Sequence, residues 1–152
     1  PTFYLAVDVL IFVAMIAIVV TGSCISNHIF NGLIDMKIQR NITIHQLHVS
    51  LPFALMILIG LHLGRNWKGF YQRLNSLLPI NPSFGKLVSI ALIVVGVVGV
   101  HMNQLVDRLL MKHIFGTPAT QLNGGLFLLL LIGMLALFTA IGFAVNHLIR
   151  KT

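Results

Sequence analysis

The sequence has few charged residues and almost no cysteine. Only 9% of its 152 residues are charged, glutamate is absent, and three aspartates are the only acids. A soluble domain has about a quarter charged residues, whereas 57% of this chain is hydrophobic, so we expect lipid to be its main solvent. The single cysteine, Cys24, excludes an internal disulfide, an iron–sulfur cluster held by this chain alone, and the two-cysteine attachment of a c-type haem.

Motifs for binding soluble substrates are also missing. No glycine-rich loop of the phosphate-binding type occurs, which argues against a self-contained enzyme. Ten Lys and Arg against three Asp give a formal charge of +7, but no basic patch with interleaved aromatic residues accompanies them. The cations lie between apolar runs, where membrane proteins carry them. We therefore expect membrane lipid, and no nucleic acid, as a partner.

Four apolar runs are long enough to cross a hydrocarbon core of about 30 Å. They predict helices at about residues 3–27, 43–68, 84–112 and 121–149. The connections are short and include a proline-containing loop at 71–83, so neighbouring helices should be antiparallel. The predicted fold is all-α: a single domain, residues 1–152, forming an integral membrane up-down four-helix bundle. In such a bundle the second and fourth helices would lie diagonally, with a gap between them.

The basic residues predict an orientation. The side with both termini carries six of them and the opposite side four, a bias that places the termini in the cytoplasm. The six are Arg65, Lys68, Arg73, Lys86, Arg150 and Lys151, and the four are Lys37, Arg40, Arg108 and Lys112.

Two histidines in the second predicted helix, His48 and His62, are the strongest functional signal. They are 14 residues apart, which in an α-helix places them about 40° apart in azimuth and about 21 Å apart along the axis. A polar side chain in a membrane span is costly and usually has a partner or a function. One helix with two inward imidazoles can give one ligand to each of two stacked b-type haems. The alternative is that each imidazole hydrogen-bonds a neighbouring helix.

The opposite haem ligands can be sought by depth in the membrane. His62 and His147 each precede an arginine by three residues, so we expect them to lie level and to bind one haem. For His48 the candidates are His101, which we prefer, and His28, which remains the alternative. The four preferred histidines would then be the axial ligands of two haem irons.

Two pairs of basic residues could compensate the haem propionates, one pair at each end of the bundle. These are Arg65 and Lys68 near the cytoplasmic side, and Lys37 and Arg40 near the opposite side. His45 lies about 60° in azimuth from His48 and about 100° from His62, and His113 follows Lys112 at a helix end. We expect both of these histidines to be interface residues without a haem.

Two segments of the second predicted helix resemble the flavinylation-associated cytochrome family of prokaryotic membrane proteins. They are Ile44-His45-Gln46-Leu47-His48 and Leu61-His62-Leu63-Gly64-Arg65-Asn66-Trp67-Lys68. The family's hallmark is a helix with histidines at this spacing and a short Asn-Trp-Lys-like exit. Asp8 and Thr21-Gly22 also look like the family pattern, and the resemblance covers roughly residues 4–70. The same spacing occurs in cytochrome b subunits of quinol-oxidising complexes, membrane hydrogenases and formate dehydrogenases.

The resemblance implies a b-type cytochrome subunit of the prokaryotic cytoplasmic membrane. Such a subunit passes electrons between a quinone pool and a flavin, iron–sulfur or c-type cytochrome partner, and quinone is a further candidate ligand. The resemblance carries over His48 and His62 as axial ligands. The second half departs from the pattern, because Gly133 falls where a partner to His147 at this spacing would lie, so one haem or two stays open. The alternatives are a haem-free membrane anchor or scaffold and a small channel or carrier.

Overall fold

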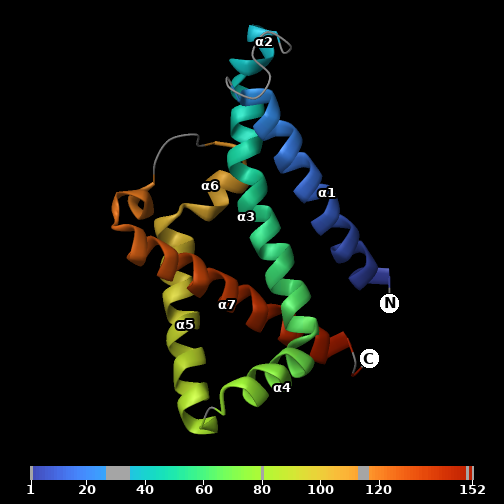
Figure 1. The fold of residues 1–152 in the computed structure, drawn as a ribbon, viewed down its shortest axis with the longest axis vertical. Coiled ribbons are helices and arrows are strands. Elements are labelled where there is room, and N and C mark those ends of the chain that lie inside the picture. Colours follow the sequence, from blue (N-terminus) through green and yellow to red (C-terminus); the bar gives the residue numbers. More distant parts are fainter. Residues whose placement is uncertain (1, 27–34, 80, 113–116, 150, 152) are drawn as a thin grey trace.

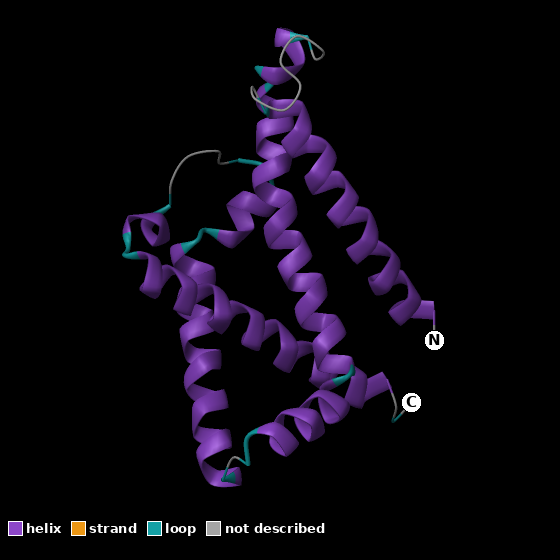
Figure 2. Cartoon of the chain, viewed as in Figure 1, coloured by secondary structure: helices purple, strands orange, loops and turns teal. Residues whose placement is uncertain are grey.

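The computed structural model describes residues 2–26, 35–79, 81–112, 117–149 and 151. All regular secondary structure in these residues is helical (Figures 1 and 2). Four helices are long and apolar enough to cross a membrane, namely α1 Thr2–Ile25, α3 Ile42–Arg65, α5 Pro82–Met102 and α7 Gly124–Ile149. The prediction of an all-α protein with four spanning helices is confirmed.

Asparagine side chains mark where three of these helices begin. Asn41, Asn81 and Asn123 each accept a hydrogen bond from a backbone N–H two or three residues further on, at 2.9 to 3.0 Å. The first N–H groups of a helix have no intrahelical partner, so a side-chain acceptor there stabilises the helix start. Pro82 occupies the first turn of α5, where its missing N–H costs nothing.

The second and third spans are shorter than predicted, and a short helix follows each. α3 ends at Arg65, and α4 (Trp67–Leu77) occupies much of the segment predicted to be a loop. The loop prediction is wrong for this segment. Its apolar residues recur with a helical period, but the polar residues between them made the segment look like a loop. α5 ends at Met102, and α6 (Leu105–Leu109) follows a break where Gln104 has a φ of 49°. The remaining helical pieces are α2 (Met36–Gln39) and the 3₁₀ turn η1 (Pro118–Gln121).

The long helices pack in the spatial order α1, α3, α7, α5. α3 lies between α1 and α7, and α7 in turn packs along α5 (Figure 1). The second and fourth spans are therefore direct neighbours, and the expectation that they lie diagonally with a gap between them is wrong.

Glycines explain the close approach of α3 and α7. A Cβ added at Gly142 would lie 2.7 Å from the Leu61 Cα, and one added at Gly64 would collide with the backbone of Thr139. Small residues let membrane helices bring their backbones together, since packing rather than water drives their association. A porphyrin cannot enter between the two helices at this contact.

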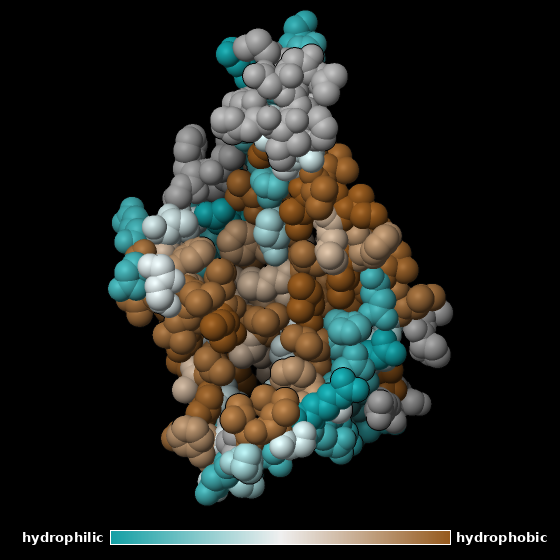
Figure 3. Space-filling view, viewed as in Figure 1, coloured by the Kyte–Doolittle hydropathy of each residue, from teal (hydrophilic) through white to brown (hydrophobic). Residues whose placement is uncertain are grey.

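The surface of the long helices is apolar. Large side chains on α1 such as Leu5, Phe12 and Val19 are more than 60% exposed. Figure 3 shows hydrophobic residues over the middle of the molecule and hydrophilic ones gathered near the end of α3. An exposed apolar belt of this kind suits contact with lipid chains, and the predicted ligand His62 lies in the last turn of α3.

Candidate functional site

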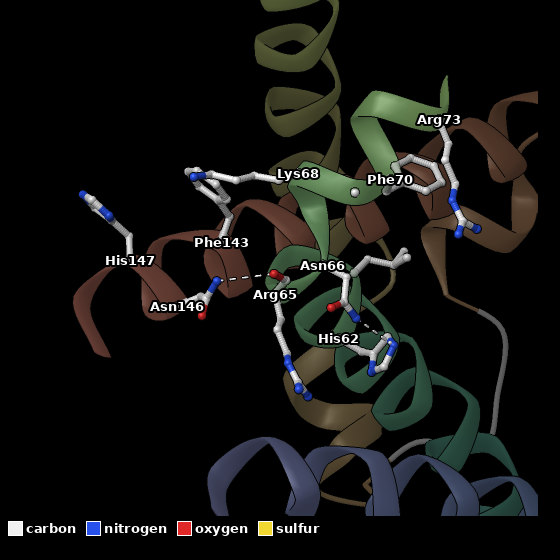
Figure 4. Close-up of a pocket in the computed structure, with 11 residues that line it drawn as sticks. His62, Arg65, Asn66, Lys68, Phe70, Arg73, Phe143, Asn146 and His147 are labelled. Atoms are coloured by element: carbon white, nitrogen blue, oxygen red, sulfur yellow. Dashed lines mark hydrogen bonds between the residues drawn. The ribbon is translucent and has the colours of Figure 1, made fainter. Parts of the chain in front are cut away.

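His62, in the last turn of α3, has a polar partner at each ring nitrogen. Its Nδ1 lies 2.6 Å from Oδ1 of Asp8 on α1. Its Nε2 lies 3.2 Å from Nδ2 of Asn66, a contact that Figure 4 marks with a dashed line. A carboxylate can only accept, so Nδ1 carries a proton and donates it to Asp8. Because the Asn66 amide donates to Nε2, a neutral ring protonated on Nδ1 satisfies both contacts.

Asp8 also connects α1 to Arg65 of α3, and a network extends from there to α7. Nη1 of Arg65 lies 3.5 Å from Asp8 Oδ2, and its Cζ lies 4.5 Å from the ring centre of Tyr4. The Tyr4 hydroxyl donates to Oδ1 of Asn146 at 2.5 Å. Nδ2 of Asn146 donates to the Arg65 carbonyl at 3.3 Å, as Figure 4 shows. The ion pair is more than a third exposed, so its value lies in fixing the geometry more than in stability.

His48, nearer the other end of α3, also faces α1. Its Nδ1 lies 3.0 Å from Oγ1 of Thr21. The Thr21 hydroxyl also lies 2.7 Å from the carbonyl of Ala17. When it donates its one proton to that carbonyl, Oγ1 accepts from His48 Nδ1 and the lone pair of the ring is on Nε2.

Gly22 makes room for the His48 imidazole. A Cβ added at Gly22 would lie 2.9 Å from Cε1 of His48 and 3.7 Å from its Nε2. A real Cβ does not approach a ring atom so closely, and the backbone of α1 therefore supports the ring at this depth. The two histidines of α3 thus share one arrangement: each places Nδ1 within hydrogen-bond distance of a side-chain oxygen on α1. Donation of Nδ1–H to that oxygen leaves the lone pair on Nε2.

His147, the predicted partner of His62, is exposed near the end of α7. Both histidines line one open pocket of about 550 Å³. In Figure 4 the His147 side chain lies at the far end of the pocket and points away from His62. The structure brings the two residues to the same pocket without facing them toward each other.

The predicted ligands at the other end lie apart. His101 is exposed in the last turn of α5, which packs on α7; no hydrogen bond between described residues joins it to α3. The alternative ligand His28 lies outside the described residues. Arg40 is exposed beyond the end of α2, and His45 Nε2 lies 2.9 Å from the Gln39 carbonyl.

Arg108, predicted to be an interface cation, is 7% exposed. Its Nε donates to the Asn103 carbonyl at 3.1 Å, its guanidinium lies 4.9 Å from the Phe53 ring centre, and its own carbonyl accepts from the Ser50 hydroxyl. Burial lowers the pKa of Arg108 by desolvation. The side chain connects the α5–α6 break to Phe53 of α3, while the backbone carbonyl of Arg108 contacts Ser50, two residues from His48.

Sequence reasoning noticed Asp8 and Thr21 only through the family pattern and did not pair them with the histidines. A signal was available, because Asp8 is the one acid inside the first apolar run, and an acid there needs a partner. Tyr4 and Asn146 were missed altogether. A tyrosine and an asparagine at the edges of two spans gave no local pattern that would have joined them.

Comparison with known proteins finds no matching protein family, no matching curated protein and no matching solved structure. The class of the protein therefore follows from its own features. Four long apolar helices with an exposed apolar belt define a multi-pass helical membrane protein. A polar network that joins α1, α3 and α7 lies at one end of these helices.

Proposed function

We propose that this protein is a b-type cytochrome subunit that relays electrons between a quinone pool and a partner redox protein. The observation that carries the proposal is the shared arrangement of His48 and His62. In each, Nδ1 lies within hydrogen-bond distance of a side-chain oxygen on α1, and donation of Nδ1–H to that oxygen leaves the lone pair on Nε2. Histidines that bind metal almost always donate their other ring N–H in this way, which fixes the ring and raises its basicity.

The donor set fits haem iron. Bis-imidazole ligation needs a neutral ring with an unprotonated nitrogen, and an oxygen on α1 is in place at both sites to accept Nδ1–H. None of the described residues hydrogen-bonds Nε2 of His48, while the amide of Asn66 would have to leave Nε2 of His62 for a metal to bind. Haem, when bound, supplies reversible one-electron redox chemistry. His147, and His101 or His28, remain the predicted ligands opposite.

The protein's own residues would orient these ligands and neutralise charge. Asp8 holds the His62 ring and Arg65 together at one end, and Arg65 and Arg40 are the predicted partners of haem propionates. The redox partner would be a flavin, iron–sulfur or c-type cytochrome protein, and quinone a further ligand. We place the chain in the prokaryotic cytoplasmic membrane with both termini in the cytoplasm, following the positive-inside bias.

Reduced-minus-oxidised absorption spectra of the purified protein test the proposal. We expect b-type alpha bands in the wild type and a smaller band in each of the variants His48→Ala and His62→Ala. His45→Ala is the matched control, because His45 lies on the same helix and bonds a backbone carbonyl. It should keep the full band. The absence of b-type bands from the wild type, or equal spectra for all three variants, would refute the proposal.

A haem-free anchor is the second candidate, and one observation favours it. Both nitrogens of His62 already have partners within the chain, as expected for a histidine that only bridges helices. In that case His62→Ala would lower the thermal stability of a colourless protein. The cytochrome proposal predicts instead that His62→Ala loses haem absorbance, because the axial imidazole is removed.

A further inference from the structure

The helix α4 joins two membrane spans at one end of the molecule. α3 ends at Arg65, α5 begins at Pro82, and α4 runs between these two ends (Figure 1). All residues of α4 are described, none of them is buried, and no described helix packs along it beyond its junction with α3. Since α3 and α5 are long enough to cross the membrane, the segment that joins their ends lies at the membrane boundary.

The side chains of α4 are divided between an apolar face and a polar face. At 100° per residue, the apolar side chains fall within an arc of about 120°, and they are Trp67, Phe70, Tyr71, Leu74 and Leu77. The ring centre of Trp67 lies 5.7 Å from that of Phe70 and 6.5 Å from that of Tyr71. Phe70, Tyr71 and Leu77 are 44%, 38% and 79% exposed. The described chain therefore leaves much of this apolar face uncovered.

The apolar face of α4 is turned toward the membrane spans. Trp67 and Phe70 line an apolar groove of about 340 Å³, and α5 and α7 provide most of its other lining residues. Among these are Leu92 and Leu135, which lie well inside the apolar spans. None of the described residues that line the groove is charged. This side of α4 is therefore the hydrocarbon side, where aromatic residues of a membrane protein lie favourably near the boundary.

A basic residue lies beyond each edge of the apolar face. Lys68 is about 60° beyond Tyr71 at one edge, and Arg73 is about 40° beyond Leu77 at the other. Their side chains point to opposite sides in Figure 4. Long basic side chains in such positions keep their stems along apolar surface and extend their charges to water and headgroups. This distribution of aromatic and basic residues is typical of a helix that lies in the plane of a membrane interface.

We propose that α4 binds the phospholipid surface of the leaflet at this end of the spans and lies in the membrane plane. Its aromatic face is immersed among the upper parts of the acyl chains, about 5–10 Å into the boundary. Lys68 and Arg73 reach the headgroups on either side of the helix. A partner protein on the apolar face would have to approach from the hydrocarbon side, where lipid is already present. Binding of this kind needs no haem and is therefore independent of the proposed electron relay.

The chain's single tryptophan makes the depth of α4 measurable. Trp67 is the only tryptophan, so Trp67→Phe gives a background in which one new tryptophan at a time is placed along α4. Tyr71→Trp and Leu74→Trp probe the apolar face. Gln72→Trp and Ser76→Trp are the matched controls, since both positions lie about 160° from the centre of that face. The full-length protein is reconstituted into phosphatidylcholine nanodiscs whose acyl chains are brominated either near the headgroup or near the chain end. Each intensity is divided by that in unbrominated lipid, which removes quenching by any other group.

We expect bromine near the headgroup to quench Tyr71→Trp and Leu74→Trp most strongly, and soluble acrylamide to quench Gln72→Trp and Ser76→Trp instead. A helix with its side chains is about 10–12 Å wide, so the two faces should differ in depth by about 10 Å. A depth that changes steadily along the helix would overturn the proposal, because α4 would then be inclined to the membrane. Equal acrylamide quenching of all four variants would also overturn it, because the apolar face would then lie in water.

The wild type supplies a second measurement if Trp67→Phe prevents folding. Trp67 belongs to the apolar face and lines the groove, so we expect strong quenching by bromine near the headgroup and weak quenching by acrylamide. Strong quenching by acrylamide, or none by bromine, would contradict an apolar face immersed in lipid.

Discussion

Nδ1 of His62 on α3 lies 2.6 Å from Oδ1 of Asp8 on α1, and both side chains are about 40% exposed. This contact joins the most distinctive residue of the sequence to the only acid inside an apolar span. It determines which nitrogen of His62 is available to a ligand. The contact also ties the end of α1 to the end of α3, because Asp8 bonds Arg65 as well.

Replacing Asp8 by Asn should weaken haem binding at His62. The amide keeps the size of the side chain but removes the charge that holds the Nδ1 proton and Arg65. Loss of such an outer partner lowers metal-site affinity by about 10- to 100-fold. Haem titration of the apoprotein measures the effect. Asp35→Asn is the control, since Asp35 accepts from the Lys37 backbone N–H in an exposed turn, and it should bind haem as the wild type does.

Replacing Thr21 by Val should act on His48 alone. Valine has nearly the same shape but offers no acceptor to Nδ1, so the tautomer is no longer fixed. We expect an affinity loss of about 10- to 100-fold at one haem site, with the His62 site unchanged. Thr139→Val removes a hydroxyl that also donates to a carbonyl of its own helix but touches no histidine. If both variants lost haem equally, the assigned role of Thr21 would be wrong.

The environment of His48 and His62 could be predicted only in part from the sequence. Helical periodicity alone put His48 and His62 on one face of one helix, and the structure agrees, since both rings contact α1. The sequence could not show which helix covers that face. That depends on the register and rotation of α1 against α3, which no short-range pattern determines.

The packing of α3 on α7 was beyond the sequence for a similar reason. The glycines at 60, 64 and 142 are visible, but small residues suit either a helix contact or a close ligand. The break at Asn66 and the helix α4 were also missed. The segment is polar and is followed by prolines, which is typical of a loop, and only the 3.6-residue period of its apolar residues indicates a helix. Hydrophobicity was enough to predict four spans because each exceeds the length that a bilayer requires.

Replacing Gly64 by Ala should separate α3 from α7. The added Cβ would meet the backbone of Thr139, Gly142 and Phe143, and a backbone cannot move aside as a flexible side chain can. We expect the free energy of unfolding to fall by about 1–3 kcal/mol, read as a lower melting temperature in detergent. At Gly69 a Cβ would meet nothing within 4 Å. Gly69→Ala should leave stability unchanged or raise it by about 0.5–1 kcal/mol.

Replacing Arg108 by Lys should destabilise the α5–α6 break although the charge is kept. Lysine cannot bond the Asn103 carbonyl and the Thr117 hydroxyl from one planar group while stacking on Phe53, as arginine does. We expect a loss of about 1–2 kcal/mol, measured by thermal unfolding in detergent. Lys112→Gln, which changes an exposed cation nearby, should melt like the wild type. Equal melting of Arg108→Lys and the wild type would show that the buried contacts contribute little.

The most direct test of the central claim is the haem content per chain of the purified protein. The account predicts b-type haem in the wild type, less in His48→Ala and in His62→Ala, and none when both histidines are replaced. A wild-type protein without haem, or a double variant that keeps its haem, would contradict the claim that these two imidazoles bind haem iron.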